Sequence, residues 1–298
     1  MATNILIIGN GFDLYHNLPT RYTDFLTLVD YWDDFYSEYQ SVLESFKFGC
    51  FEPKHKISLD LNCGKFTRDA VKEIASNACM FDKENIDYLN NHLKTNKWIQ
   101  YFNETGYKEE GWIDFEREIE NVLLRIERYF SIILPSIESQ KIKREICAPI
   151  INDTSLDLIL ELFGDNIDLA DVGNAFDLES NNQIDRAKQK NLLIHNMKNE
   201  LDVLIICFRL YILEFVNWIE VNRHCDQIDK LGKFKLLTFN YTSILSEYYP
   251  NHLIEEPCYV HGNVTDNNMV MGIRDDFCEN TDYIYFQKYF QRIQKEQE

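Results

Sequence analysis

The sequence predicts an α/β fold in which a Rossmann-like parallel sheet is interrupted by a large helical insertion. A short apolar run that ends in a Gly-x-Gly turn begins the chain, and three similar runs occur near its other end. The long middle segment has the periodicity of helices instead. We therefore assign residues 1–25 and 230–298 to the sheet core, and residues 26–229 to a mostly helical insertion or lid.

The first apolar run, Asn4 to Ile8, is rich in isoleucine and shows almost no alternation. This pattern is typical of a strand that is buried on both faces, as in a parallel sheet. The glycines of Gly9-Asn10-Gly11-Phe12 allow a sharp turn in which backbone N–H groups approach a ligand closely. A helix that begins after this turn would direct its positive end at a phosphate or carboxylate. An ordinary tight turn between a strand and a helix is the alternative.

Three further apolar runs lie near the C-terminal end, and polar residues or glycine follow each of them. These runs are Lys233 to Thr238, Cys258 to Val260 and Asn268 to Met271. Ligands of an open parallel sheet bind outside the carboxyl ends of its strands, so the residues after the four runs should meet at one rim. These residues are Asp13, Asn240, His261 and Gly272. Four unrelated turns at strand ends are the alternative.

Composition limits the possible functions. Of the 298 residues, 45% are hydrophobic and 14% aromatic, which is enough for a sizeable core and excludes a disordered protein. The formal net charge of −19 argues against a nucleic-acid partner and against an anionic membrane surface. No apolar run approaches the ~20 residues of a membrane span.

The cysteine pattern and the start of the chain favour a cytoplasmic location. The eight cysteines form no Cys-x-x-Cys pair, which favours reduced thiols. Met1-Ala2-Thr3-Asn4 leads directly into the first predicted strand, so we expect no signal peptide. P-loop, Gly-x-Ser-x-Gly and His-Glu-x-x-His motifs do not occur in the sequence, which argues against those enzyme classes.

The middle segment contains an apolar stripe at steps of three and four residues. The stripe consists of Trp112, Phe115, Ile119, Val122, Ile126, Phe130 and Ile133. It predicts an amphipathic helix, and the dense apolar segment from Leu192 to Val221 predicts a central buried helix. The helical region could cover the rim, bind a partner or only pack. Asp114 and Glu116 are accordingly either acids of a first helical turn or contacts across the cleft.

The candidate site residues combine acid–base groups with hydrogen-bonding groups. His261 suits a general base, because an imidazole titrates near neutral pH; otherwise it closes a turn. Asn240 could orient a ribose or a water, or satisfy the backbone as a buried amide. Asp13 could stabilise an oxocarbenium-like centre or cap a helix. We expect no metal, because Asp13, His16 and His261 lack the spacing of a metal site.

Several sequence blocks resemble one known family. Ile7 to Tyr22 looks like the opening of the AbiH family of bacteriophage abortive-infection proteins, and Gly111 to Glu116 resembles its central Trp-x-Asp-Phe-Glu motif. Further blocks resemble its later motifs. They are Thr238 to Thr242, His261-Gly262, Gly272-Ile273 and Tyr289 to Ile293. The resemblance spans nearly the whole chain.

AbiH proteins in turn resemble the sirtuin-like (SIR2) proteins, in which four blocks surround NAD. The matching blocks here are Gly9-Asn10-Gly11, Asn17-Leu18-Pro19, Phe239-Asn240 and His261-Gly262. The resemblance implies a SIR2-like sheet with NAD as ligand or substrate, and it places His261 beside the nicotinamide ribose. The residues that it implies for nucleotide binding are Gly9, Asn10, Gly11, Phe12, His16, Pro19, Thr20, Thr238, Tyr241, Gly262 and Gly272.

The resemblance implies a phage-defence effector that binds NAD or a related nucleotide and hydrolyses the nicotinamide N-ribosyl bond. His261 and Asn240 would direct water to the ribose, with Asp13 stabilising the positive centre. The alternative is a non-catalytic nucleotide-binding sensor or regulatory module, whose helical region binds a phage protein or a partner subunit. Either protein could form a homo-oligomer.

The sequence departs from the family pattern at two places. The family often has glycine where this chain has Asn17, and asparagine tolerates a left-handed backbone next best, so we expect the turn to survive. AbiH-like chains usually continue into a Gly-His-Ser-Leu-x-x-x-Asp segment, whose sirtuin-like equivalent lines the adenosine side. This sequence ends at Glu298 before such a segment. We therefore expect the segment to come from a longer chain, a second reading frame or another component.

Overall fold

The computed structural model describes residues 4–45, 56–59, 66–77, 81–105, 114–133, 154–164, 182–275 and 281–295. The chain forms two compact units. Unit 1 comprises Met1–Thr95, Lys108–Ile113 and Ile205–Val270, and unit 2 comprises Asn96–Tyr107, Asp114–Leu204 and Met271–Glu298. The predicted division into 1–25 with 230–298 and 26–229 stays a prediction.

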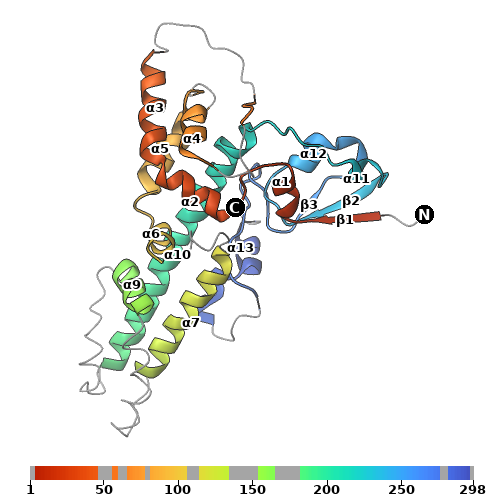
Figure 1. Ribbon diagram of the computed structural model, residues 1–298. Coiled ribbons are helices and arrows are strands. Elements are labelled where there is room, and N and C mark those ends of the chain that lie inside the picture. Colours follow the sequence, from red (N-terminus) through yellow and green to blue (C-terminus); the bar gives the residue numbers. More distant parts are fainter. Residues whose placement is uncertain are drawn as a thin grey trace. The chain divides into compact units, whose positions relative to one another are not determined.

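Unit 1 contains a parallel sheet with the strand order β1-β2-β3 (Figure 1). The strands are β1 (Asn4–Ile8), β2 (Phe234–Thr238) and β3 (Cys258–Tyr259). Thr238 pairs with both Ile8 and Tyr259, so the three strands end at the same level. The predicted α/β fold with a parallel sheet is confirmed, and three of the four predicted runs supply its strands.

The fourth strand prediction is wrong. Asn268–Met271 forms no strand, because its backbone N–H groups bind elsewhere. The amide of Val270 donates to the carbonyl of His261 (3.0 Å), and the amide of Met271 donates to the side chain of Gln291 (3.1 Å). An apolar run therefore did not specify strand pairing by itself.

The prediction that β1 is buried on both faces is also wrong. Ile5 is 65% exposed and Ile7 is 61% exposed. Leu6 and Ile8, on the opposite face, pack against the core cluster that includes Leu236. A strand with apolar residues at every position carries no alternation to show which of its faces is covered.

The other elements of unit 1 in the described ranges are helices. They are α1 (Gly11–Tyr15), α2 (Tyr22–Asp30), α3 (Trp32–Ser45), α4 (Arg68–Ala75), α5 (Lys83–His92), η5 (Val216–Trp218), α11 (Asp226–Asp229), α12 (Ile244–Tyr248) and η6 (Pro250–His252). An aromatic core joins α3 to the end of α10 (Asn182–Glu214), where Phe35 and Phe215 meet with ring centroids 4.9 Å apart.

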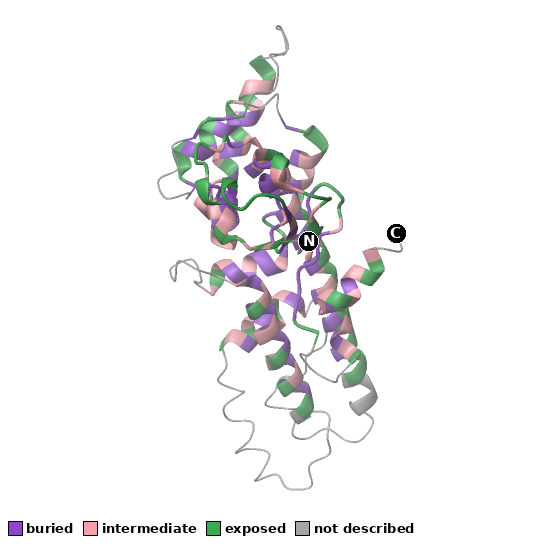
Figure 2. Ribbon diagram, turned by 90° about the vertical axis from the view of Figure 1, so that its right-hand side faces the viewer, coloured by how far each residue is buried: buried purple, intermediate pink, exposed green. Residues whose placement is uncertain are grey.

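Unit 2 contains α6 (Lys97–Glu104), α7 (Phe115–Ile133), α9 (Thr154–Phe163), η7 (Thr281–Phe286) and α13 (Lys288–Lys295). The predicted stripe is confirmed on α7. Its members Phe115, Ile119, Val122, Ile126 and Phe130 are each at most 1% exposed. Trp112 and the side chain of Ile133, which complete the predicted stripe, lie outside the described residues. Buried and exposed residues alternate along the helices in Figure 2, as expected of amphipathic helices.

The bounds of the predicted central helix are wrong, although the helix exists. It was expected from Leu192 to Val221, whereas α10 begins at Asn182 and ends at Glu214. After Glu214 the chain forms the short turn η5 and then extends, so that Ile219 forms a parallel bridge with Ile57. Among the described residues, no helix is long and apolar enough to cross a membrane.

Replacing Phe115 with alanine should lower the free energy of unfolding by about 3–5 kcal/mol. Phe115 is completely buried and stacks on Phe102 with ring centroids 4.1 Å apart. The control is Leu124→Ala on the same helix, where the side chain is 49% exposed; this change should stay within about 0.5 kcal/mol. Urea unfolding followed by circular dichroism measures both, and equal effects would contradict the assigned buried face of α7.

Candidate functional site

A sharp turn connects β1 to α1 at the carboxyl end of the sheet. The amide of Phe12 donates to the carbonyl of Gly9 (2.9 Å), which reverses the chain. Neither Gly9 nor Gly11 has a positive φ. A Cβ at either glycine would find no atom of the described chain within 4 Å. The packing of the protein therefore does not require glycine here, and the backbone of the turn is open to a ligand.

Asp13 connects α1 to the segment that follows β2. It is 2% exposed. One carboxylate oxygen accepts a hydrogen bond from Asn240 Nδ2 (2.8 Å), and the other accepts one from Thr242 Oγ1 (2.7 Å). Burial raises the pKa of Asp13 to about 7, although both hydrogen bonds lower it. The helix-capping alternative is wrong, since the residue at the N-cap of α1 is Asn10.

The side chain of Asn240 is held in one orientation. It is 4% exposed, and its backbone amide donates to Thr238 Oγ1 (3.0 Å). The amide nitrogen of the side chain donates to Asp13, so the amide oxygen is directed away from that carboxylate. This buried oxygen has no hydrogen-bond partner among the described residues. Because buried polar atoms are rarely left unpaired, the oxygen is suited to accept a hydrogen bond from a ligand or a water.

His261 lies at the end of the neighbouring strand. Thr238 of β2 pairs with Tyr259 of β3. Asn240 lies two residues after Thr238, and His261 lies two residues after Tyr259, so both leave the sheet at the same level. The amide of Val260 donates to the carbonyl of Thr238 (2.9 Å), which extends the pairing towards His261. The imidazole contacts Phe239 edge-on, with ring centroids 5.4 Å apart. The sheet therefore brings Asp13, Asn240 and His261 to one rim.

Tyr241, which was also predicted to bind the nucleotide, borders this rim. Its ring centroid lies 6.5 Å from that of His261, and its hydroxyl donates to the carbonyl of Val270 (3.0 Å). Thr242 is the residue that sequence reasoning missed. It lies two residues after Asn240 in the same block, and this spacing was the available signal.

The two later glycines of the predicted site have structural reasons of their own. Gly262 has a φ of +74°, and a Cβ there would lie 2.2 Å from the carbonyl oxygen of Asn268. Gly272 belongs to unit 2, and its Cβ would lie 2.0 Å from the carbonyl oxygen of Phe286. Close packing therefore accounts for both glycines, and their contact with a nucleotide stays a prediction.

The loop after α1 folds back on the glycine turn. Thr20 Oγ1 donates to the side-chain oxygen of Asn10 (2.5 Å), and Asn10 Nδ2 donates to the carbonyl of Thr20 (3.3 Å). Asn17 has a φ of 61°, so the expectation that asparagine preserves the left-handed turn is confirmed. The carbonyl of Pro19 accepts a hydrogen bond from the hydroxyl of Tyr211 (2.5 Å).

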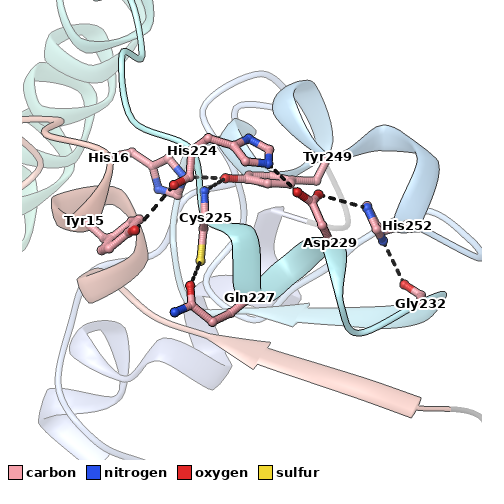
Figure 3. A network of polar contacts seen from close by, with 9 residues as sticks. All are labelled: Tyr15, His16, His224, Cys225, Gln227, Asp229, Gly232, Tyr249 and His252. Atoms are coloured by element: carbon pink, nitrogen blue, oxygen red, sulfur yellow. Dashed lines mark hydrogen bonds and ion pairs between the residues drawn. The ribbon is translucent and has the colours of Figure 1, made fainter.

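His16 anchors the C-terminal end of α1 through Tyr249 (Figure 3). Its Nδ1 lies 2.8 Å from the carbonyl of Phe12 and therefore donates to it. Its Nε2 then accepts from the hydroxyl of Tyr249 (2.8 Å), which itself accepts from the amide of Cys225 (2.7 Å). Burial lowers the pKa of His16, in agreement with a neutral ring. Both ring nitrogens are used within the protein, and contact of His16 with a nucleotide stays a prediction.

The two acids of the central motif lie in unit 2. Asp114 accepts hydrogen bonds from the amides of Glu116 (3.1 Å) and Arg117 (3.2 Å), so it caps α7. Glu116 pairs with Lys288 (2.5 Å). Burial raises the pKa of Glu116, and Lys288 opposes this shift. Both acids line a cavity of about 530 Å³ within unit 2, together with Gly272. Their contact with the nucleotide stays a prediction.

Replacing Asp13 with asparagine should change how stability depends on pH. The pKa of Asp13 is about 7 in the folded chain, against an ordinary value of 3.8. Between these values the folded chain binds one proton more than the unfolded chain, so its unfolding free energy falls as pH rises. The slope reaches about 1.4 kcal/mol per pH unit and disappears above a pH of about 7.

Urea unfolding of wild type and Asp13→Asn over this pH range isolates the contribution of Asp13, because all other titrating groups are shared. The stability of the wild type relative to the variant should decline from about pH 4 to about pH 7. A difference that is constant over the range would show that the folded carboxyl titrates normally.

Comparison with known proteins agrees with these observations. The family model described as "Bacteriophage abortive infection AbiH" matches residues 5–298. No curated protein and no solved structure matches the chain. The family match covers the glycine turn, the residues at the strand ends and α7, and it extends over nearly all of the sequence. The chain therefore belongs to the AbiH family of bacteriophage abortive-infection proteins.

Proposed function

We propose that the protein is a phage-defence effector that binds NAD or a related nucleotide at the rim of the unit 1 sheet and hydrolyses the nicotinamide N-ribosyl bond. The observation that carries the proposal is the buried amide oxygen of Asn240. It has no partner among the described residues, and Asp13 holds the amide that bears it. Such an oxygen suits a ribose hydroxyl or a water molecule, both of which can donate to it.

The glycine turn supports the binding part of this proposal. Gly9 and Gly11 have open space where a side chain would stand. A pyrophosphate can approach the backbone there as it does in other dinucleotide-binding sheets. The net charge of −19 does not prevent this, because backbone N–H groups bind phosphate locally. The loop from Asn10 to Thr20, closed by its two mutual hydrogen bonds, would border the bound nucleotide.

Three residues would have roles in the hydrolysis. The bond between C1′ of the ribose and the nicotinamide nitrogen breaks, and nicotinamide leaves with the bonding electron pair. Water adds to C1′, and His261 accepts the proton that the water or a ribose hydroxyl loses. Asn240 would orient the donor of that proton. Asp13 would act through Asn240, since both of its carboxylate oxygens already bind Asn240 and Thr242.

Depletion of NAD would explain the biological outcome, because a cell without NAD cannot support phage replication. The localisation expected from the sequence, the cytoplasm, is where such depletion would act. A phage protein is the proposed trigger. A homo-oligomer and a partner subunit are proposed forms of the active assembly.

The pKa of Asp13 favours a second candidate function. A carboxyl with a pKa of about 7 is only partly ionised at neutral pH, which weakens its ability to stabilise a positive ribose centre. The same hydrogen bonds would serve a sensor or regulatory module that binds the nucleotide without cleaving it. Nicotinamide release from NAD by the purified protein separates the two functions.

Replacing His261 with alanine should reduce nicotinamide release by about 10²–10⁴-fold, which is the usual contribution of a positioned general base. NAD affinity should change little, because the glycine turn is untouched. His195→Ala is the control, since this histidine on α10 is exposed and its hydrogen bond among the described residues is with Asn199 of the same helix. Chromatography of the reaction products measures both variants. Full activity of the His261 variant would exclude the assigned role.

Replacing Gly11 with valine should weaken NAD binding by at least tenfold while the melting temperature changes little. The branched side chain would occupy the space proposed for phosphate, and no described atom lies within 4 Å of its Cβ. Calorimetric titration gives the affinity, and thermal unfolding gives the stability. Unchanged affinity would mean that the turn is only structural.

A further inference from the structure

A second cluster of polar side chains lies before β2 and after α12, and the proposed hydrolysis does not use it (Figure 3). The cluster contains His224, Asp226, Asp229 and His252. One ligand atom from each of the first three lies within 4.8 Å of the others. His224 Nε2 lies 2.7 Å from one oxygen of Asp229, and His252 Nε2 lies 3.4 Å from the other. We propose that this cluster, which is independent of the proposed hydrolysis, binds one Zn²⁺ ion.

His252 holds the ligand Asp229 in place. Its Nδ1 lies 2.9 Å from the carbonyl of Gly232 and donates to it. Its Nε2 faces one oxygen of Asp229 at 3.4 Å, while His224 Nε2 faces the other oxygen at 2.7 Å. Carboxylates that bind metals are usually oriented by such outer partners.

The charges of the cluster agree with this assignment. Asp226 and Asp229 lie one helical turn apart in α11. In the described part of the chain, no lysine or arginine forms an ion pair with either carboxylate, and the ion pairs of Asp229 are with histidines. A divalent cation would neutralise both acids.

The donor atoms favour zinc over the alkaline-earth ions. One imidazole and two carboxylates offer a nitrogen and two oxygens within 4.8 Å of one another, and zinc accepts such a three-ligand set with water as its fourth ligand. Calcium and magnesium prefer sets made of oxygen alone. Cys225 is not part of the set, because its sulfur is directed at Gln227 at 3.2 Å (Figure 3).

A bound ion would stabilise the helix that carries Asp13. The carbonyl of His224 accepts from the hydroxyl of Tyr15 (3.4 Å), and the amide of Cys225 donates to Tyr249, the partner of His16. Both contacts fasten α1 to the segment that begins with His224. An ion that holds this segment in place would therefore also hold α1, so zinc is expected to raise the melting temperature of the full chain.

The experiment titrates chelator-treated full-length protein with ZnCl₂ by calorimetry, and with CoCl₂ by visible absorption. One Zn²⁺ per chain should bind, and Co²⁺ should give the d–d bands of a four-coordinate site. His224→Ala and Asp229→Asn should each weaken binding more than about tenfold. Asp226→Asn should do the same, and it should leave the fold intact because this side chain is exposed and asparagine keeps its shape. His195→Ala and Cys225→Ser are the controls and should bind as the wild type does.

Failure of Zn²⁺ to bind at submillimolar concentration would overturn the proposal. Binding that survives Asp226→Asn and Asp229→Asn, or that is lost in Cys225→Ser, would also overturn it, because the ion would then lie elsewhere. Mg²⁺ at millimolar concentration should neither displace Zn²⁺ nor raise the melting temperature, and displacement by Mg²⁺ would contradict the nitrogen-containing ligand set.

Discussion

The hydrogen bonds of the buried carboxylate of Asp13 are the interaction on which the candidate site depends. They join α1 to the segment after β2, and the two partners of Asp13 are separated from it by more than two hundred residues of sequence. A carboxylate without donors would be costly at 2% exposure. Asn240 and Thr242 lower this cost, while burial still raises the pKa of Asp13 to about 7. The rim can form only when both ends of the chain have folded together.

Parallel pairing explains why distant residues meet at this rim. Thr238 pairs with Ile8 on one side and with Tyr259 on the other, so three segments leave the sheet at one level. The bond between His16 and Tyr249 then fastens the C-terminal end of α1 to the residue that follows α12. α1 therefore has one polar attachment at Asp13 and another at its C-terminal end, which suits a short helix that has to present a ligand-binding turn.

The central motif of the family, Gly111 to Glu116, has structural roles in addition to its proposed role in nucleotide binding. Asp114 caps α7, and Phe115 begins its buried stripe. Glu116 pairs with Lys288 at the start of α13. A short motif can thus fix the beginning of a helix, its packing face and its partner helix. These tasks account for the two acids beside Phe115 without requiring either acid to touch a nucleotide.

The sequence alone determined the parallel strands, the glycine turn, the left-handed Asn17 and the buried face of α7, because each follows from local residue pattern. Tertiary structure decided the rest. An apolar run could not show that Asn268–Met271 would bind His261 and Gln291 and form no strand, or that Ile5 and Ile7 would be exposed. Nor could it show that Asp13 would bind Asn240 and Thr242, or that His224, Asp229 and His252 would gather. Such contacts depend on burial and on partners that are distant in sequence, and a local residue pattern gives information about neither.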